Sequence, residues 1–73
     1  MIDVANTKVG DKVHYLPEHY SDRECENGIV KEIPGHTCGF VKVVYNCAGN
    51  WSRYSKYTAA MTSTKDLYAG WRC

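Results

Sequence analysis

FVKVVY (residues 40–45) is the most strand-like run of this 73-residue chain. Its valines and aromatic residues are types that favour a pleated, packed surface. A second run, Ile29-Val30-Lys31-Glu32-Ile33, comes before it and ends at Pro34-Gly35, a pair typical of a tight turn. The two runs therefore predict two strands joined by a short connection.

A further strand is expected before these two runs. Val13 and Tyr15 alternate with Lys12 and His14, which is the pattern of a half-buried strand with His14 toward solvent or the loops. Leu16-Pro17 should end it, because proline cannot donate to a strand ladder. A long polar loop follows, and Asn27-Gly28 predicts a turn after that loop.

The C-terminal third predicts two short strands around a helical turn. Residues 58–62 are expected to form the fourth strand and residues 69–71 the fifth. Between them, Ser63 or Thr64 would cap a short helical turn, and Leu67 would anchor it in the core. Residues 1–8 carry little periodic signal and are expected to be a lead-in to a single domain that spans residues 1–73.

Five short strands and one helical turn predict a small all-β, partly open five-stranded barrel. The arrangement resembles SH3-like small barrels, which include the Tudor and KOW groups. That resemblance implies a strong bend in a glycine-led second strand and a turn directly before the last strand. It rests on residues 9–13, Asn27–Ile33, Phe40–Tyr45 and Lys65-Asp66-Leu67.

A second resemblance is to small proteins encoded by phages and prophages. It rests on Val44-Tyr45-Asn46-Cys47, Trp51, Tyr54, Tyr57-Thr58, Thr64-Lys65-Asp66-Leu67 and Gly70-Trp71. The resemblance implies a protein that acts in the cytoplasm of an infected bacterium. Several such proteins have no catalytic apparatus and sequester the nucleotide signals of host immune systems, which implies a similar anti-defence role here.

Size and charge limit the functions that the chain can have. Nine Lys and Arg against eight Asp and Glu give a formal charge of +1, which disfavours binding to long nucleic acid. No apolar run approaches the ~20 residues of a membrane span, and the N-terminus lacks the pattern of a signal peptide. We therefore expect a cytosolic protein. A domain this small is marginally stable alone, so we also expect a homo-oligomer.

Four cysteines, Cys25, Cys38, Cys47 and Cys73, form no CxxC pair. The usual zinc-binding spacing is therefore absent, and we expect neither a metal nor a cofactor. A cytosolic chain favours free thiols, while a disulfide or a metal site stays the alternative.

The segment from Trp51 to Thr58 is the candidate binding site. Trp51, Tyr54 and Tyr57 recur every three residues, with Arg53 and Lys56 between them. The aromatic residues could pack on the barrel, line an interface between protomers, or form a ligand platform. As the loop between the third and fourth strands, the segment favours a structural role for Trp51 and a functional role for Tyr54 and Arg53.

A nucleotide ligand gives this segment a mechanism. Bases stack on tyrosine and tryptophan rings, while Arg53 takes a phosphate bidentately and Lys56 acts as a point charge. Asn46 could recognise a base edge. In an SH3-like topology, Tyr20 and Arg23 of the first loop would lie near the same end of the barrel.

The catalytic alternative has little support in the sequence, because no nucleophile, base or acid pair has a recognisable spacing. A methylated-lysine cage or a proline-rich peptide site would use the same aromatic residues. A cage usually includes a carboxylate, and residues 46–64 contain none. The leading hypothesis is therefore a non-enzymatic protein that binds a nucleotide or short oligonucleotide. The alternatives are a module that docks on a host or phage protein and a KOW-like RNA- or DNA-binding domain.

Overall fold

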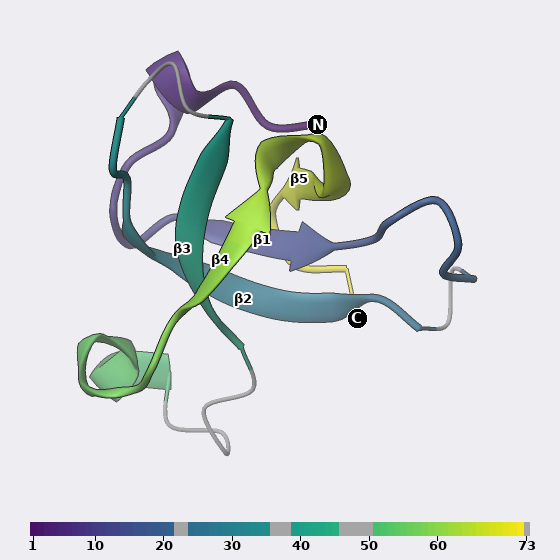
Figure 1. The fold of residues 1–73 in the computed structure, drawn as a ribbon. Coiled ribbons are helices and arrows are strands. Elements are labelled where there is room, and N and C mark those ends of the chain that lie inside the picture. The colour runs from purple at the N-terminus through teal and green to yellow at the C-terminus, as the bar shows by residue number, and fades with distance from the viewer. Residues whose placement is uncertain (22–23, 36–38, 46–50, 73) are drawn as a thin grey trace.

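The computed structural model describes residues 1–21, 24–35, 39–45 and 51–72. Five antiparallel strands form one sheet in the order β4-β3-β2-β1-β5 (Figure 1). The strands are β1 Lys12–Tyr15, β2 Glu26–Glu32, β3 Phe40–Tyr45, β4 Ala60–Ser63 and β5 Leu67–Ala69. Three short 3₁₀ turns accompany them: η1 Val4–Asn6, η2 Trp51–Lys56 and η3 Thr64–Asp66. The expected all-β class, with five strands and a helical turn before the last, is confirmed.

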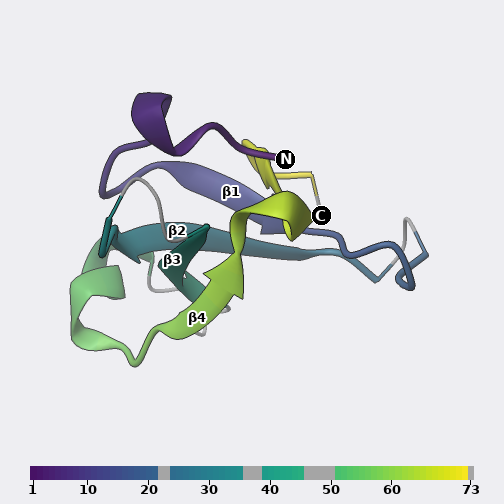
Figure 2. The ribbon, with the colours of Figure 1, turned by 45° about the horizontal axis from the view of Figure 1, so that its top comes forward.

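The sheet curls into a half-barrel, which is compatible with an SH3-like barrel (Figures 1 and 2). β2 is the longest strand and pairs with both β1 and β3. Its register with β3 shifts between Val30 and Glu32, and such a bulge bends a strand and increases its twist. At the other end of the curl, η3 carries the chain from β4 to β5. The Leu16 amide donates to the Asp66 carbonyl at 2.9 Å and fixes this turn beside β1.

The core fills the inner face of the curl. Because side chains alternate along a strand, one set from β1, β2, β3 and β5 points inward together. Its fully or almost fully buried members are Val13, Val30, Val41, Val43 and Leu67. Burying a side chain of this size contributes about 1.5–3 kcal/mol, so these five residues supply much of the stability of the fold. Leu67 is the core anchor that the sequence predicted.

The N-terminal segment, expected to be a lead-in, also contributes to this core. Ile2 and Val4 are buried and pack against the inner-face residues. The Asp3 carboxylate accepts a hydrogen bond from the Ala5 amide at 3.1 Å and so caps η1. The Ile2 amide donates to the Thr64 carbonyl, which ties the segment to η3. A chain this short uses its first residues to cover the open side of the half-barrel.

A second, smaller buried area lies on the outer face of the sheet. Ile29 and Val44 are paired in the register of β2 and β3, and each sits between two inner-facing neighbours. Both are buried, yet neither belongs to the inner core cluster. η2 contacts β2, and Figures 1 and 2 show η1 and η2 on opposite sides of β2. The aromatic segment therefore helps to cover an outer apolar pair.

The turn predicted at Asn27-Gly28 is wrong, because both residues lie inside β2. Gly28 has a different physical role there. A Cβ atom at this position would lie 2.5 Å from Cγ1 of Val43 and 3.0 Å from both Cδ1 of Tyr45 and the Val44 carbonyl oxygen. The close approach of β3 therefore requires glycine at this position. The Asn-Gly pair reflects this steric requirement and not a turn.

The last strands are displaced by about two residues from their predicted positions, a typical boundary error. β4 covers Ala60–Ser63 and β5 covers Leu67–Ala69, so Trp71 is not in a strand. β5 is followed by Gly70, whose φ of +83° lies in the left-handed region that glycine tolerates. Its amide donates to the Lys12 carbonyl at 2.8 Å. The turn at Gly70 lets the chain double back.

The free thiol expected at Cys25 is also wrong. Cys25 is buried and disulfide-bonded, while Cys38, Cys47 and Cys73 lie outside the described residues. In the alternation of β2, Cys25 lies on the side of Asn27 and Ile29, which is the outer face. The disulfide therefore ties down a residue at the start of the strand that carries both buried areas.

Replacing Gly28 with alanine should destabilise the fold by about 1–3 kcal/mol, the usual cost of overpacking. The cause is the overlap of the new methyl group with Val43 and with the backbone of β3. Gly35→Ala is the matched control, because nothing lies within 4 Å of a Cβ atom there. Urea unfolding of both variants measures the effect, and equal midpoints would show that β3 does not need glycine at Gly28.

Candidate functional site

The aromatic segment contacts β2, and its three aromatic residues make different contacts. The Trp51 and Trp71 ring centroids are 4.6 Å apart, so Trp51 packs against the C-terminal tail. The Tyr54 hydroxyl is 3.4 Å from the position of a Cβ atom on Gly10. The Tyr57 carbonyl accepts a hydrogen bond from Lys31 Nζ at 2.7 Å. None of the residues of η2 is fully buried, so these contacts leave part of each aromatic side chain accessible.

Trp71 joins this segment, although the sequence placed it in the last strand. The turn at Gly70 brings Trp71 back over the sheet, where its Nε1 donates to the Gly28 carbonyl at 2.9 Å. Lys12 Nζ lies 4.7 Å from the centroid of the Trp71 ring, which is a cation–π geometry. In the sequence, only Gly70 indicates a turn before Trp71. A glycine predicts the turn but not the position of the residue that follows it.

The outer face therefore gathers aromatic and basic residues from four parts of the chain. We call this set the basic aromatic surface; its members are Lys12, Lys31, Trp51, Arg53, Tyr54, Lys56, Tyr57 and Trp71. Arg53 and Lys56 are exposed, while the aromatic members are half-buried. Rings that are partly accessible can stack on a planar ligand, and the flanking cations can bind phosphate oxygens.

The other predicted ligand-binding residues do not join this surface in the described structure. Asn46 and Arg23 lie outside the described residues. Tyr20 contacts the rings of Tyr15 and His19. Because Tyr15 is on the inner face with Val13, Tyr20 belongs to a different part of the molecule from Trp51. The first loop projects away from η2 in Figure 1, although Cys25 at the end of that loop lines a cavity with Trp51.

A second group of aromatic residues forms around Tyr15. The Tyr15 ring lies edge-on to Tyr20, with centroids 5.5 Å apart, and to Tyr45, with centroids 6.0 Å apart. The Tyr45 hydroxyl forms a 2.9 Å hydrogen bond with Oγ1 of Thr62 on β4. We call Tyr15, Tyr20 and Tyr45 the tyrosine cluster. Sequence reasoning identified only Tyr20 as a candidate, because the three tyrosines come from separate elements.

Two carboxylates accompany the tyrosine cluster. Burial raises the pKa of Tyr15, and the negative charges of Asp66 and Glu26 add to that shift. Burial likewise raises the pKa of Tyr45 to about 12, against the opposing effect of its hydrogen bond with Thr62. Glu26 and Asp66 contribute to this increase as well. The environment of the tyrosine cluster is therefore electrostatically negative, in contrast to the basic aromatic surface.

His14 lies on the outer face of β1, opposite in direction to Val13, but the turn at Gly70 covers it, so the expected exposure to solvent is wrong. It is only 8% exposed. Its Nδ1 donates to the Gly70 carbonyl at 2.8 Å, since a carbonyl can only accept, and its ring stacks on Tyr68 at 5.5 Å. The turn at Gly70 that places Trp71 also covers His14. These contacts assign His14 a structural role in holding the C-terminal tail.

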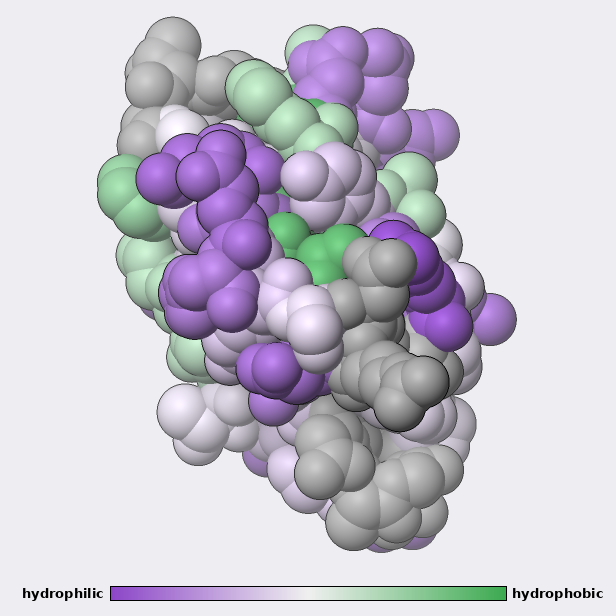
Figure 3. All heavy atoms as spheres, turned by 90° about the vertical axis from the view of Figure 1, so that its right-hand side faces the viewer, coloured by the Kyte–Doolittle hydropathy of each residue, from purple (hydrophilic) through white to green (hydrophobic). Residues whose placement is uncertain are grey.

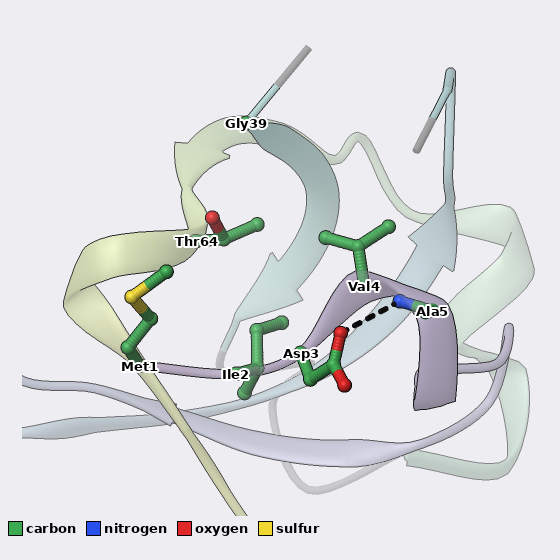
Figure 4. A pocket seen from close by; sticks show the side chains of 7 residues that line it. All are labelled: Met1, Ile2, Asp3, Val4, Ala5, Gly39 and Thr64. Carbon is green, nitrogen blue, oxygen red and sulfur yellow. Dashed lines mark hydrogen bonds between the residues drawn. The ribbon is translucent and has the colours of Figure 1, made fainter. Parts of the chain in front are cut away.

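A cavity of ≈ 530 Å³ lies between the N-terminal segment and the start of β3 (Figure 4). Met1, Ile2 and Val4 line one side, with Gly39 and Thr64 opposite. Its one carboxylate, on Asp3, already accepts hydrogen bonds from Ala5 and Asn6. A cavity whose charged group is already engaged in capping offers few groups to orient a ligand.

Comparisons with known proteins do not assign a function. No family model, curated protein or solved structure matches the chain. Within the described residues, no group of three or more His, Cys, Asp or Glu side chains could hold a metal ion. In the same part of the chain, no helix has the length and apolar character needed to span a bilayer. Functional inference therefore depends on the two aromatic groups.

Alkaline pH should destabilise the protein partly through Tyr45. A phenol with a raised pKa keeps its proton more tightly in the folded state, so stability is unaffected below pH 10 and decreases as pH rises towards 12. Tyr45→Phe removes this loss, although losing the hydrogen bond to Thr62 costs about 1 kcal/mol at neutral pH. Urea unfolding of both proteins at pH 8 and 11 tests this. A parallel loss of stability in the two proteins would contradict the assignment.

Proposed function

We propose that the chain is a non-enzymatic protein that binds a nucleotide or a short oligonucleotide on the basic aromatic surface. The observation that carries the proposal is the placement of Lys12 and Lys31, from two strands, beside the rings of η2 and Trp71. Together with exposed Arg53 and Lys56, they put four cations around partly accessible rings. That combination suits a compact ligand with both planar bases and phosphates.

The overall charge of the protein supports a short ligand. The formal charge is +1, yet basic groups gather at η2 while Glu26 and Asp66 gather at the tyrosine cluster. A long polyanion would extend beyond the basic aromatic surface, whereas a dinucleotide-sized ligand would not. The resemblance to small phage proteins suggests an immune signal of the host as this ligand. The fold alone does not support a KOW-like or Tudor-like function, because proteins that share a fold can differ in function.

Tryptophan fluorescence gives a direct test, because Trp51 and Trp71 are the two tryptophans of the chain and both belong to the surface. Cyclic dinucleotides and short oligoadenylates should quench it on stacking. Arg53→Ala should weaken binding about tenfold, the effect of losing one charge-assisted hydrogen bond, and keep the unfolding midpoint. Lys65→Ala, an exposed cation on η3, is the matched control. No binding by any probe at ~100 μM would refute the proposal, because a sequestering protein must bind far more tightly.

The compartment can be tested in the same titration. A cytoplasmic site of action is part of the proposal, whereas the disulfide at Cys25 is of a kind that persists mainly in oxidising compartments. A cytoplasmic protein must therefore bind its ligand with this disulfide reduced. Binding that is unchanged by a reductant would agree with a cytoplasmic role, and binding that disappears would place the protein in an oxidising compartment.

We also propose that the protein forms a homo-oligomer. Phe40 and Met61 lie on neighbouring strands and are 46% and 56% exposed. On an edge strand, exposed apolar side chains and unpaired backbone groups favour association with another chain. Sedimentation velocity should show a dimer or larger species that Met61→Glu converts to monomer. A wild-type protein that stays monomeric at ~100 μM would refute the proposed homo-oligomer.

A further inference from the structure

We propose that the tyrosine cluster and its two carboxylates form a site for an organic cation, a primary ammonium or guanidinium group of the size of a lysine or arginine side chain. This site is separate from the basic aromatic surface and does not depend on nucleotide binding. Three features carry it: a cavity, the two tyrosines Tyr15 and Tyr45 that line it, and two carboxylates that form no ion pair among the described residues.

The cavity has the right size for one side chain. Its volume is ≈ 320 Å³, and it lies between the ends of β1, β2 and β3 and the whole of β4. Tyr15, Tyr45, Glu26, Asp66 and Met61 are among the residues that line it. A second cavity of ≈ 300 Å³ adjoins it, with Tyr15 and Asp66 common to both. An extended ligand could therefore place its charged group in one cavity and its chain in the other.

The rings present a suitable surface for a cation. Tyr15 is edge-on to both of its neighbours, at interplanar angles of 83° with Tyr20 and 65° with Tyr45. Tyr15 and Tyr45 line the ≈ 320 Å³ cavity, while Tyr20 packs edge-on against Tyr15 without lining either cavity. A cation within about 6 Å of such ring faces is attracted by their quadrupoles, more strongly when water is excluded.

The carboxylates supply the charge that a cation requires. Among the described residues, Glu26 and Asp66 form no ion pair; the ion pair found there joins Lys42 Nζ to Glu32 at 3.3 Å, on the outer face. Burial is the main cause of the raised pKa values of Tyr15 and Tyr45, and Glu26 and Asp66 are close enough to both phenols to add to them. In the second cavity, Lys65 partly offsets Glu18. The combined charge around the two cavities is negative.

One face of the molecule has the polarity of a surface that binds a protein partner. Figure 3 views the molecule from the side on which the first loop projects, and the described residues there are mostly hydrophilic around a small hydrophobic centre. A polar rim around a small apolar area is the usual anatomy of a transient protein interface. A protein segment that presents a lysine or arginine, or a free polyamine, would supply the required cation.

Amide chemical-shift perturbation in two-dimensional NMR tests the site with defined probes. Nα-acetyl-lysine amide and Nα-acetyl-arginine amide stand for a protein side chain, and 1,4-diaminobutane stands for a free polyamine. The shifts should centre on Tyr15, Glu26 and Asp66, and Nε-acetylation of the lysine probe should abolish them. Stronger binding of the amino-acid probes indicates a protein partner, and stronger binding of the diamine indicates a polyamine. No saturable shifts from any probe at 20 mM would overturn the proposal.

Two substitutions separate the site from a structural cluster. Asp66→Asn keeps the shape of the side chain and should weaken cation binding about tenfold, the effect of losing one charge-assisted contact. Glu32→Gln is the matched control, because it removes a carboxylate that is already paired on the other face. Nucleotide quenching of Trp51 and Trp71 should be the same in both variants. Equal cation affinity in Asp66→Asn and in the wild-type protein would refute the site and leave the proposed nucleotide function untouched.

Discussion

The close approach of β3 to Gly28 is the constraint on which the rest of the structure depends. On the inner face, the missing side chain lets Val43 and Tyr45 pack directly over the backbone of β2. On the outer face, the carbonyl of the same residue accepts the hydrogen bond of Trp71. One residue without a side chain thus supports the core, one member of the tyrosine cluster and one member of the basic aromatic surface. A larger residue would separate β2 from β3 and weaken all three.

β2 also explains how a nearly neutral protein acquires two surfaces of opposite charge. Glu26 opens the strand beside Tyr15, with which it is paired in the register. Lys31 lies at the other end, within the bulge, and reaches the Tyr57 carbonyl. A bulge changes the direction in which a side chain points, so a regular strand would not direct Lys31 in the same way. Opposite ends of one bent strand thus contribute Glu26 to the tyrosine cluster and Lys31 to the basic aromatic surface.

The sequence predicted the strands well where burial and periodicity agree, as in Phe40–Tyr45 and at Leu67. The prediction failed where the same sequence pattern can arise from two different physical requirements. Asn-Gly is typical of a turn, yet Gly28 is set by the contact with β3. Alternation placed His14 on the outer face correctly but could not show that the chain returns over that face. For the candidate site, the sequence analysis grouped Tyr20 with Trp51, because the expected SH3-like topology places their loops at the same end of the barrel.

By itself, the sequence determined the all-β class, the five strands and the helical turn, because these depend on local periodicity and on residues that are neighbours in the chain. It also determined that Arg53, Tyr54 and Lys56 share one short segment. Only the tertiary structure decided what stands beside that segment. Lys12 and Trp71 reach it through the turn at Gly70, and Tyr15, Tyr45 and Asp66 meet through strand pairing and η3. Contacts between distant residues follow from the curl of the sheet, and no local pattern encodes them.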